Sequence, residues 1–166
     1  MFKLTAKAGA IAAVILAAQA SPAQAVLGPD AAACRGNGPA LLVNVDGFKA
    51  RSGNIRVNVY GSEPDRFLER GQYIRQINLR VTRAGAMPIC VSLPRAGRYA
   101  VAVRHDVDSD GNDWGDGGGF SRNPRLSLTN LRPSYQNVAF NVARGVQPVS
   151  VVLNYRYGLS IRPARG

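Results

Sequence analysis

The chain has 166 residues, of which 46% are hydrophobic, and a formal net charge of +11 at pH 7. This length is typical of one domain, and no internal repeat or linker indicates a second. The basic residues are scattered singly, with no run of five or more. The charge therefore does not indicate a basic tail of the kind that binds nucleic acid, and nucleic acid is disfavoured as a partner.

The first 25 residues have the pattern of a cleavable secretory signal. Lys3 and Lys7 precede an apolar stretch over residues 8–18, which is shorter than the ~20 residues that a membrane-spanning helix needs. An Ala-Gln-Ala tripeptide that ends at Ala25 predicts cleavage after that residue. The alternatives are a retained anchor helix and a lipoprotein attached at Cys34. The short apolar core disfavours the first, and the distance of Cys34 from that core disfavours the second.

Cleavage leaves 141 residues without another segment that suits a membrane span, so we expect a soluble periplasmic or extracellular protein. We divide it into an N-terminal segment (26–39), a sandwich domain (40–157) and a basic C-terminal tail (158–166). Export places Cys34 and Cys90 where disulfides persist, so the two are expected to pair; two buried free thiols are the alternative.

Removal of Lys3 and Lys7 lowers the formal charge to +9, and Lys49 is then the only lysine beside many arginines. One reading of this charge is an affinity for polyanions or for the surface of the cell envelope. The other is an ordinary solvated basic surface, which the scattered arginines favour.

Short stretches of alternating apolar and polar residues follow one another along the mature chain, with turn residues between them. They are residues 41–45, 55–60, 77–81, 89–93, 99–103, 138–142 and 149–155. This pattern predicts an all-β fold, a single β-sandwich of about seven strands. The first two stretches flank a turn at 51–54, so they are expected to form a hairpin. Residues 64–72 are expected to form a short helical turn, and 106–133 a long connection.

Five aspartates occur within eleven residues of that connection, and they are half of the acidic residues of the chain. Asp106, Asp108 and Asp110 precede Gly111 in the pattern D-x-D-x-D-G, which allows alternate carboxylates to converge on a cation. Position twelve of a helix-loop-helix calcium loop would be Gly117 here, so a later aspartate has to replace the usual glutamate. The candidate ligands for calcium are Asp106, Asp108, Asp110, Asn112, Asp113 and Asp116. The alternative is an Asp/Gly turn without an ion.

Four further residues in or beside this loop are candidates for contacts. His105, the only histidine, is expected to anchor the loop by hydrogen bonds; its alternative role is that of a catalytic base with Ser121 or a metal-bound water. Trp114 and Phe120 can stack on a partner such as a sugar ring, or fold back to close the end of the sandwich.

Several of these segments resemble a known bacterial family. The residues from Tyr99 to Asp106, the loop H-D-x-D-x-D-G and the later Gly-Phe-Ser of 119–121 are similar to the exported family catalogued as domain of unknown function 2141. The similarity covers most of residues 40–157. It implies an exported immunoglobulin-like or transthyretin-like sandwich without an established activity. This loop has aspartate where the family often has asparagine, so stronger cation binding is expected.

The leading hypothesis is an exported, non-enzymatic binding or structural module with a calcium-binding loop. The alternatives are an arginine-rich binder of polyanions or the envelope surface and a hydrolase that uses His105. A glycan, an envelope component and another exported protein are the partner classes left open. We also expect calcium to order residues 106–120, because five glycines and five like charges there favour expanded states.

Overall fold

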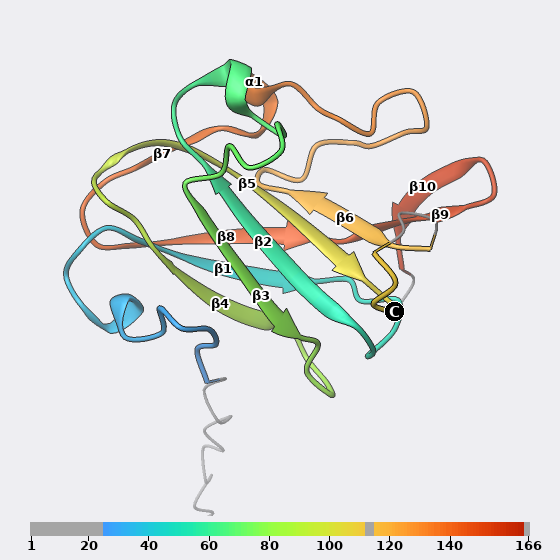
Figure 1. Cartoon of the computed structure of the whole chain (residues 1–166), viewed down its shortest axis with the longest axis horizontal. Coiled ribbons are helices and arrows are strands. Elements are labelled where there is room, and N and C mark those ends of the chain that lie inside the picture. Colours follow the sequence, from blue (N-terminus) through green and yellow to red (C-terminus); the bar gives the residue numbers. More distant parts are fainter. Residues whose placement is uncertain (1–24, 112–114, 165–166) are drawn as a thin grey trace, which may run out of the picture.

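The structure is a computed structural model that describes residues 25–111 and 115–164 (Figure 1). Within these ranges the chain forms ten strands, two 3-10 turns and one short α-helix. They are η1 (Ala33–Arg35), β1 (Ala40–Asp46), β2 (Asn54–Tyr60), η2 (Pro64–Arg66), β3 (Arg75–Arg80), β4 (Met87–Ser92), β5 (Gly97–Asp106), β6 (Gly117–Phe120), α1 (Tyr135–Val138), β7 (Phe140–Val142), β8 (Val146–Val152), β9 (Asn154–Tyr157) and β10 (Ser160–Pro163). No helix in the described ranges is both long and apolar enough to cross a membrane.

The strands form two sheets that pack face to face, which confirms the predicted all-β sandwich. The small sheet has the order β4-β1-β8, in which β1 is antiparallel to β4 and parallel to β8. The large sheet has the order β10-β9-β6-β5-β2-β3, and β7 pairs with the beginning of β5. Figure 1 shows the large sheet in front of the small one.

The core between the sheets follows the alternation in the sequence. Val43 and Val45 of β1 are fully buried, and Asn44 between them faces outward. In β2, Ile55 and Val57 are fully buried, and Arg56 between them faces outward. Because successive side chains of a strand point to opposite faces, this period of two gives each sheet one apolar face. Burial of each such side chain contributes roughly 1.5–3 kcal/mol, so the alternation is sufficient to bring the sheets together.

The expected hairpin of residues 41–45 and 55–60 is wrong. β1 pairs with β4 and β8, whereas β2 pairs with β3 and β5 in the other sheet. The connection between β1 and β2 therefore crosses from one sheet to the other, and it uses Gly47 and Gly53, both at positive φ (79° and 72°). Alternation shows that two strands exist but does not distinguish a hairpin from such a crossing.

Three C-terminal expectations change in detail. The stretch 149–155 is two strands, because the chain passes from the small sheet to the large one at the buried Leu153. The stretch 138–142 divides into the end of α1 and the short β7. Residues 158–166, expected as a tail, contain β10, which pairs with β9 beyond a turn at Gly158 (φ 60°).

The expected long connection of 106–133 also contains a strand, β6, which pairs with β5 and β9. Its glycines are required by close packing. A Cβ atom on Gly117 would lie 2.3 Å from the ring of Tyr155, and one on Gly119 would lie 2.6 Å from the carbonyl oxygen of Val152. These two glycines therefore allow neighbouring chain segments to approach, and the flexibility expected for them is wrong.

The segment before β1 lies along β4. Leu27 forms a parallel bridge with Ile89, and the predicted disulfide between Cys34 and Cys90 is present, with a Cα–Cα distance of 5.9 Å. Asp30 forms an ion pair with Arg75 of β3 and accepts a hydrogen bond from the backbone N–H of Ser92 (3.0 Å). The guanidinium of Arg75 is the main cause that holds the pKa of Asp30 below its usual value of 3.8. The N-terminal segment is thus bonded to both sheets.

A second apolar cluster covers one end of the outer face of the large sheet, the face turned away from the small sheet. Phe67, directly after the expected helical turn at η2, is at its centre, with ring centroids 5.2 Å from Tyr60, 6.2 Å from Phe120 and 5.8 Å from Tyr135. All three contacts are edge-to-face, the geometry that aromatic quadrupoles favour. The cluster fixes the segments around η2 and α1 on the sheet.

Candidate metal centre

Three of the predicted ligands come together at the end of the β5–β6 hairpin. Asp106 is the last residue of β5, Asp108 follows in the loop, and Asp116 directly precedes β6. Antiparallel pairing of β5 with β6 places His105 opposite Gly117, so the residues on either side of this pair are brought close. Each of the three aspartates offers one oxygen that lies within 4.8 Å of the other two.

The charge of this aspartate triad (Asp106, Asp108 and Asp116) is compensated in part by Arg104. The guanidinium donates to the Oδ2 atom of Asp116 through Nε (2.8 Å) and Nη2 (2.7 Å), and the Asp116 side chain is 7% exposed. The backbone N–H of Val107 donates to the other carboxylate oxygen (3.0 Å). Three carboxylates and one guanidinium leave two negative charges, the number that one divalent cation balances.

Among the residues that the structure describes, one carboxylate oxygen is buried without a partner, and it belongs to Asp106. Its Oδ1 atom is inaccessible to solvent and has no hydrogen-bond partner among the residues that the structure describes. A buried acceptor without a donor costs about 1–3 kcal/mol, and more when it carries charge. Such an oxygen beside two other carboxylates is the group whose energy a bound cation would lower most.

The remaining predicted ligands do not join the triad in the described geometry. Asp110 is exposed, and its backbone N–H donates to the Oδ1 atom of Asp108 (3.3 Å), as in the Asx turns of the ion-free alternative. Asn112 and Asp113 lie outside the described residues, as does Trp114. The structure therefore brings together three of the six predicted residues.

The turn before β2 packs against the acidic loop and forms hydrogen bonds with it. Sequence reasoning missed this contact. A Cβ atom on Gly53 would lie 1.9 Å from the carbonyl oxygen of Asp106, so only glycine fits there. The hydroxyl of Ser52 donates to the carbonyl of Val107 (2.8 Å), and the amide of Asn54 donates to the hydroxyl of Ser109 (2.9 Å). The glycine was visible in the sequence as a turn residue, but its partner is 53 residues away.

His105 anchors the base of this hairpin. Its ring is fully buried, and Nε2 lies 2.9 Å from the carbonyl oxygen of Ser52, which can only accept a hydrogen bond. The proton of the neutral ring therefore lies on Nε2, so Nδ1 accepts from the hydroxyl of Tyr155 at 2.6 Å. Burial raises the pKa of Tyr155 to about 12, which keeps this hydroxyl protonated as a donor. Both ring nitrogens of His105 therefore lie in internal hydrogen bonds, one to β9 and one to the turn before β2.

Comparison with known proteins identifies the chain. Residues 43–150 match the model of a family described as an uncharacterized protein conserved in bacteria, DUF2141. The chain belongs to the DUF2141 family. No curated protein and no solved structure matches it. The matched range includes the whole aspartate triad and the turn beneath it, so both lie inside the DUF2141 domain.

The Gly-Phe-Ser stretch of this DUF2141 chain is structural. Phe120 is nearly buried in the aromatic cluster around Phe67. Ser121 is fully buried; its hydroxyl accepts from the N–H of Val101 (3.0 Å) and donates to the carbonyl of Val138 (2.7 Å). The serine thereby ties β5 to the end of α1, and its side chain does not reach the surface.

Proposed function

We propose that this DUF2141 protein is an exported, non-enzymatic binding or structural module whose aspartate triad binds calcium. The observation that carries the proposal is the convergence of three carboxylates, one of which, Asp106, has a buried oxygen without a hydrogen-bond partner among the described residues. The donors are all oxygen atoms, which suits a hard cation. Calcium accepts six to eight ligands in flexible geometry, so water and loop carbonyls can complete its shell.

Export is supported by two independent features. The first 25 residues have the charge and apolar pattern of a secretory signal. The disulfide between Cys34 and Cys90 belongs to a chemistry that persists in oxidising compartments. Calcium sites of extracellular modules bind weakly, with Kd of about 10⁻⁴–10⁻³ M, an affinity within reach of a site with three carboxylates.

The burial and hydrogen bonding of the candidate base and nucleophile favour a binding or structural role over catalysis. His105 and Ser121 are both fully buried, and their polar side-chain atoms are occupied by internal hydrogen bonds. A general base has to reach a substrate proton, directly or through one water. Both residues instead hold the hairpin and α1 in place.

Calorimetric titration of the mature protein with calcium tests the proposal. We expect measurable heat and a rise in Tm, because calcium binds the folded state alone. Asp108→Asn should weaken calcium binding at least tenfold, because it removes one charged ligand from the triad. The matched control is Asp65→Asn, an exposed aspartate at η2, which should bind like the wild type. Absence of heat and of any Tm shift would contradict the proposal, as would equal loss in both variants.

A further inference from the structure

The outer face of the large sheet holds a groove beyond the aromatic cluster. One hollow of about 340 Å³ lies between β6, β9, β10 and the segment 126–131, and a second of about 440 Å³ lies over β2, β5 and β6. The two share Gly118, Phe120 and Leu131, so they form one continuous depression, here called the outer groove. Its volume falls in the range of small-molecule sites.

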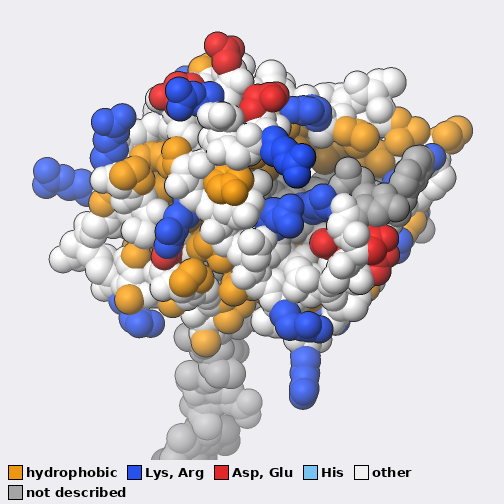
Figure 2. Space-filling model, viewed as in Figure 1, with side chains coloured by type: hydrophobic (Ala, Val, Ile, Leu, Met, Phe, Trp, Pro, Cys, Tyr) orange, Lys and Arg blue, Asp and Glu red, His pale blue; other side chains and the backbone are white. Residues whose placement is uncertain are grey.

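Arginines line the middle of the outer groove. Strand register places Arg56 of β2 directly opposite Arg104 of β5, an arrangement of like charges that destabilises a sheet. Arg132 and Arg156 also line it, against Asp116 as the one acidic residue of the lining. Figure 2 shows Lys and Arg side chains gathered over the middle of this face, beside hydrophobic ones.

The carboxylates nearby balance part of this charge. Asp116 pairs with Arg104, and Glu69 approaches Arg132 at 3.3 Å, where both side chains are more than half exposed. Arg56 donates through Nε to the amide oxygen of Asn78 (3.1 Å), and no carboxylate of the described residues lies within ion-pair distance of it. Among the described residues, the centre of the groove therefore holds one arginine, Arg56, without a carboxylate partner.

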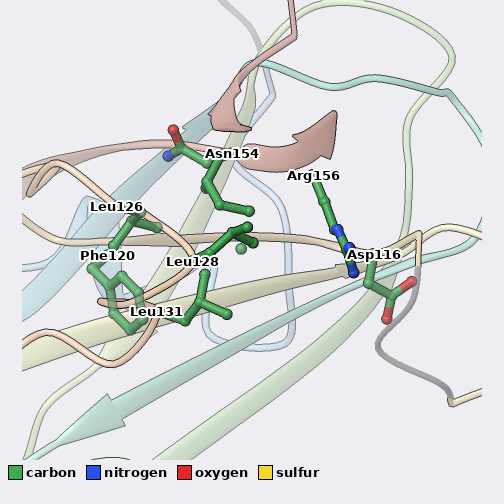
Figure 3. A pocket seen from close by; sticks show the side chains of 9 residues that line it. Asp116, Phe120, Leu126, Leu128, Leu131, Asn154 and Arg156 are labelled. Atoms are coloured by element: carbon green, nitrogen blue, oxygen red, sulfur yellow. The ribbon is translucent and has the colours of Figure 1, made fainter. Parts of the chain in front are cut away.

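The other end of the groove is apolar. Phe120, Leu126, Leu128 and Leu131 gather on one side in Figure 3, while Arg156 and Asp116 lie on the opposite side, with the carboxylate of Asp116 directed away from the leucines. Leu128 and Leu131 are 38% and 49% exposed, although both border the hollow. A pair of exposed leucines next to opposed arginines is the combination that an amphipathic anion complements.

We propose that the outer groove binds a small, monomeric amphipathic anion. Its oxyanion group would lie against Arg56, with Arg104 on the neighbouring strand, because guanidinium groups donate hydrogen bonds to such oxygens. Its apolar body would lie on Phe120 and Leu131, over the small residues Gly118 and Ala102 that give the groove its depth. This role goes beyond calcium binding and does not depend on it.

Titration of the calcium-free protein with octanoate tests this site, with octan-1-ol as the uncharged counterpart. We expect octanoate to bind at least tenfold more tightly than the alcohol and to shift the amide NMR signals of β5 and β6. Arg56→Gln should weaken octanoate binding at least fivefold without loss of stability, because it removes one of two opposed like charges. The matched control is Arg83→Gln, an exposed arginine between β3 and β4 outside the groove.

Gly118→Leu provides a steric test. A Cβ atom on Gly118 meets nothing closer than 3.7 Å, so the new side chain fits the strand and projects into the groove. We expect this variant to fold and to lose octanoate binding. Equal affinity for octanoate and octan-1-ol would overturn the proposal, as would unchanged binding by Arg56→Gln. Binding to anionic phosphatidylglycerol vesicles without binding to octanoate would also overturn it, in favour of a membrane-surface role. Asp108→Asn should keep octanoate binding, which separates this test from that of the calcium site.

Discussion

At the scale of single residues, His105 and Tyr155 show how a polar pair is stabilised inside an apolar core. Tyr155 is 1% exposed, and its hydroxyl is the donor that the Nδ1 atom of His105 requires. Ring contacts of the histidine with Phe48 (5.5 Å) and Tyr155 (5.9 Å) fill the space around this hydrogen bond. The pair thus connects the crossing turn, β5 and β9 directly beneath the aspartate triad.

Tyr155→Phe should lower the free energy of unfolding at neutral pH by about 1–3 kcal/mol, because it leaves a buried acceptor on His105 without a donor. Urea unfolding measures this change. The control is the exposed Tyr73→Phe, which should stay within about 0.5 kcal/mol of the wild type.

Tyr155→Phe should also change how the free energy of unfolding depends on pH in alkaline solution. Burial raises the pKa of Tyr155 in the folded protein to about 12, from its usual value of 10.0. Between these values the unfolded chain releases this proton and the folded chain keeps it, so wild-type stability falls as pH rises from 10 to about 12. Tyr155→Phe should lack this part of the fall, so its deficit against the wild type shrinks over that window. Parallel stability curves would show that the phenol does not titrate as stated.

At the scale of elements, the acidic loop is a short connection between two paired strands. Asp106 and Gly117 belong to paired strands, so residues 107–116 alone connect β5 to β6. The repulsion of the carboxylates therefore acts on a segment whose two ends are fixed 11 residues apart in the chain. This arrangement limits the region that a cation can order.

Removal of calcium should raise amide exchange in residues 107–111 and 115–116, because the repulsion of the triad then returns. The amides of β6 and of β5 should stay protected, since they bond to neighbouring strands. Hydrogen exchange followed by NMR, with and without a chelator, gives the pattern. Asp108→Ala should reproduce it without the chelator. Loss of protection in β5 together with the loop would mean that the ion stabilises the whole fold.

At the scale of the molecule, the sequence predicts the strands better than their partners. The apolar positions of β1, β2 and β5 are readable because each strand buries one face. The parallel pairing of β1 with β8 and the crossing from β1 to β2 are not readable, because they depend on contacts between residues far apart in the chain.

The same limit applies to the candidate site. The spacing of Asp106 and Asp108 is local and marks the loop, whereas the fit of Gly53 against the Asp106 carbonyl arises only when β2 pairs with β5. Gly117 was misjudged for the same reason, since a glycine in an acidic segment indicates flexibility until the ring of Tyr155 lies against it. Local chemistry was readable, and tertiary contacts were not.

The disulfide between Cys34 and Cys90 should contribute to the stability of the fold without affecting calcium binding. The bridge joins residues 56 apart in the chain, Cys34 in η1 and Cys90 in β4, and it fastens the N-terminal segment to the small sheet. The proposed calcium ligands belong to the β5–β6 hairpin of the large sheet. A cross-link of this span restricts the unfolded chain, so replacement of both cysteines by serine should lower the free energy of unfolding by about 2–4 kcal/mol.

Urea unfolding of this double variant measures the fall in the free energy of unfolding. Wild-type protein in reductant should show the same fall, whereas reductant should not change the stability of the variant. Calcium affinity, measured well below the unfolding transition, should stay within twofold of the wild type, because none of the triad contacts passes through β4. A fall in affinity that matches the fall in stability would instead mean that the small sheet sets the geometry of the β5–β6 hairpin across the core. The sandwich would then act as one unit, and its calcium loop would report on the redox state of a bridge in the opposite sheet.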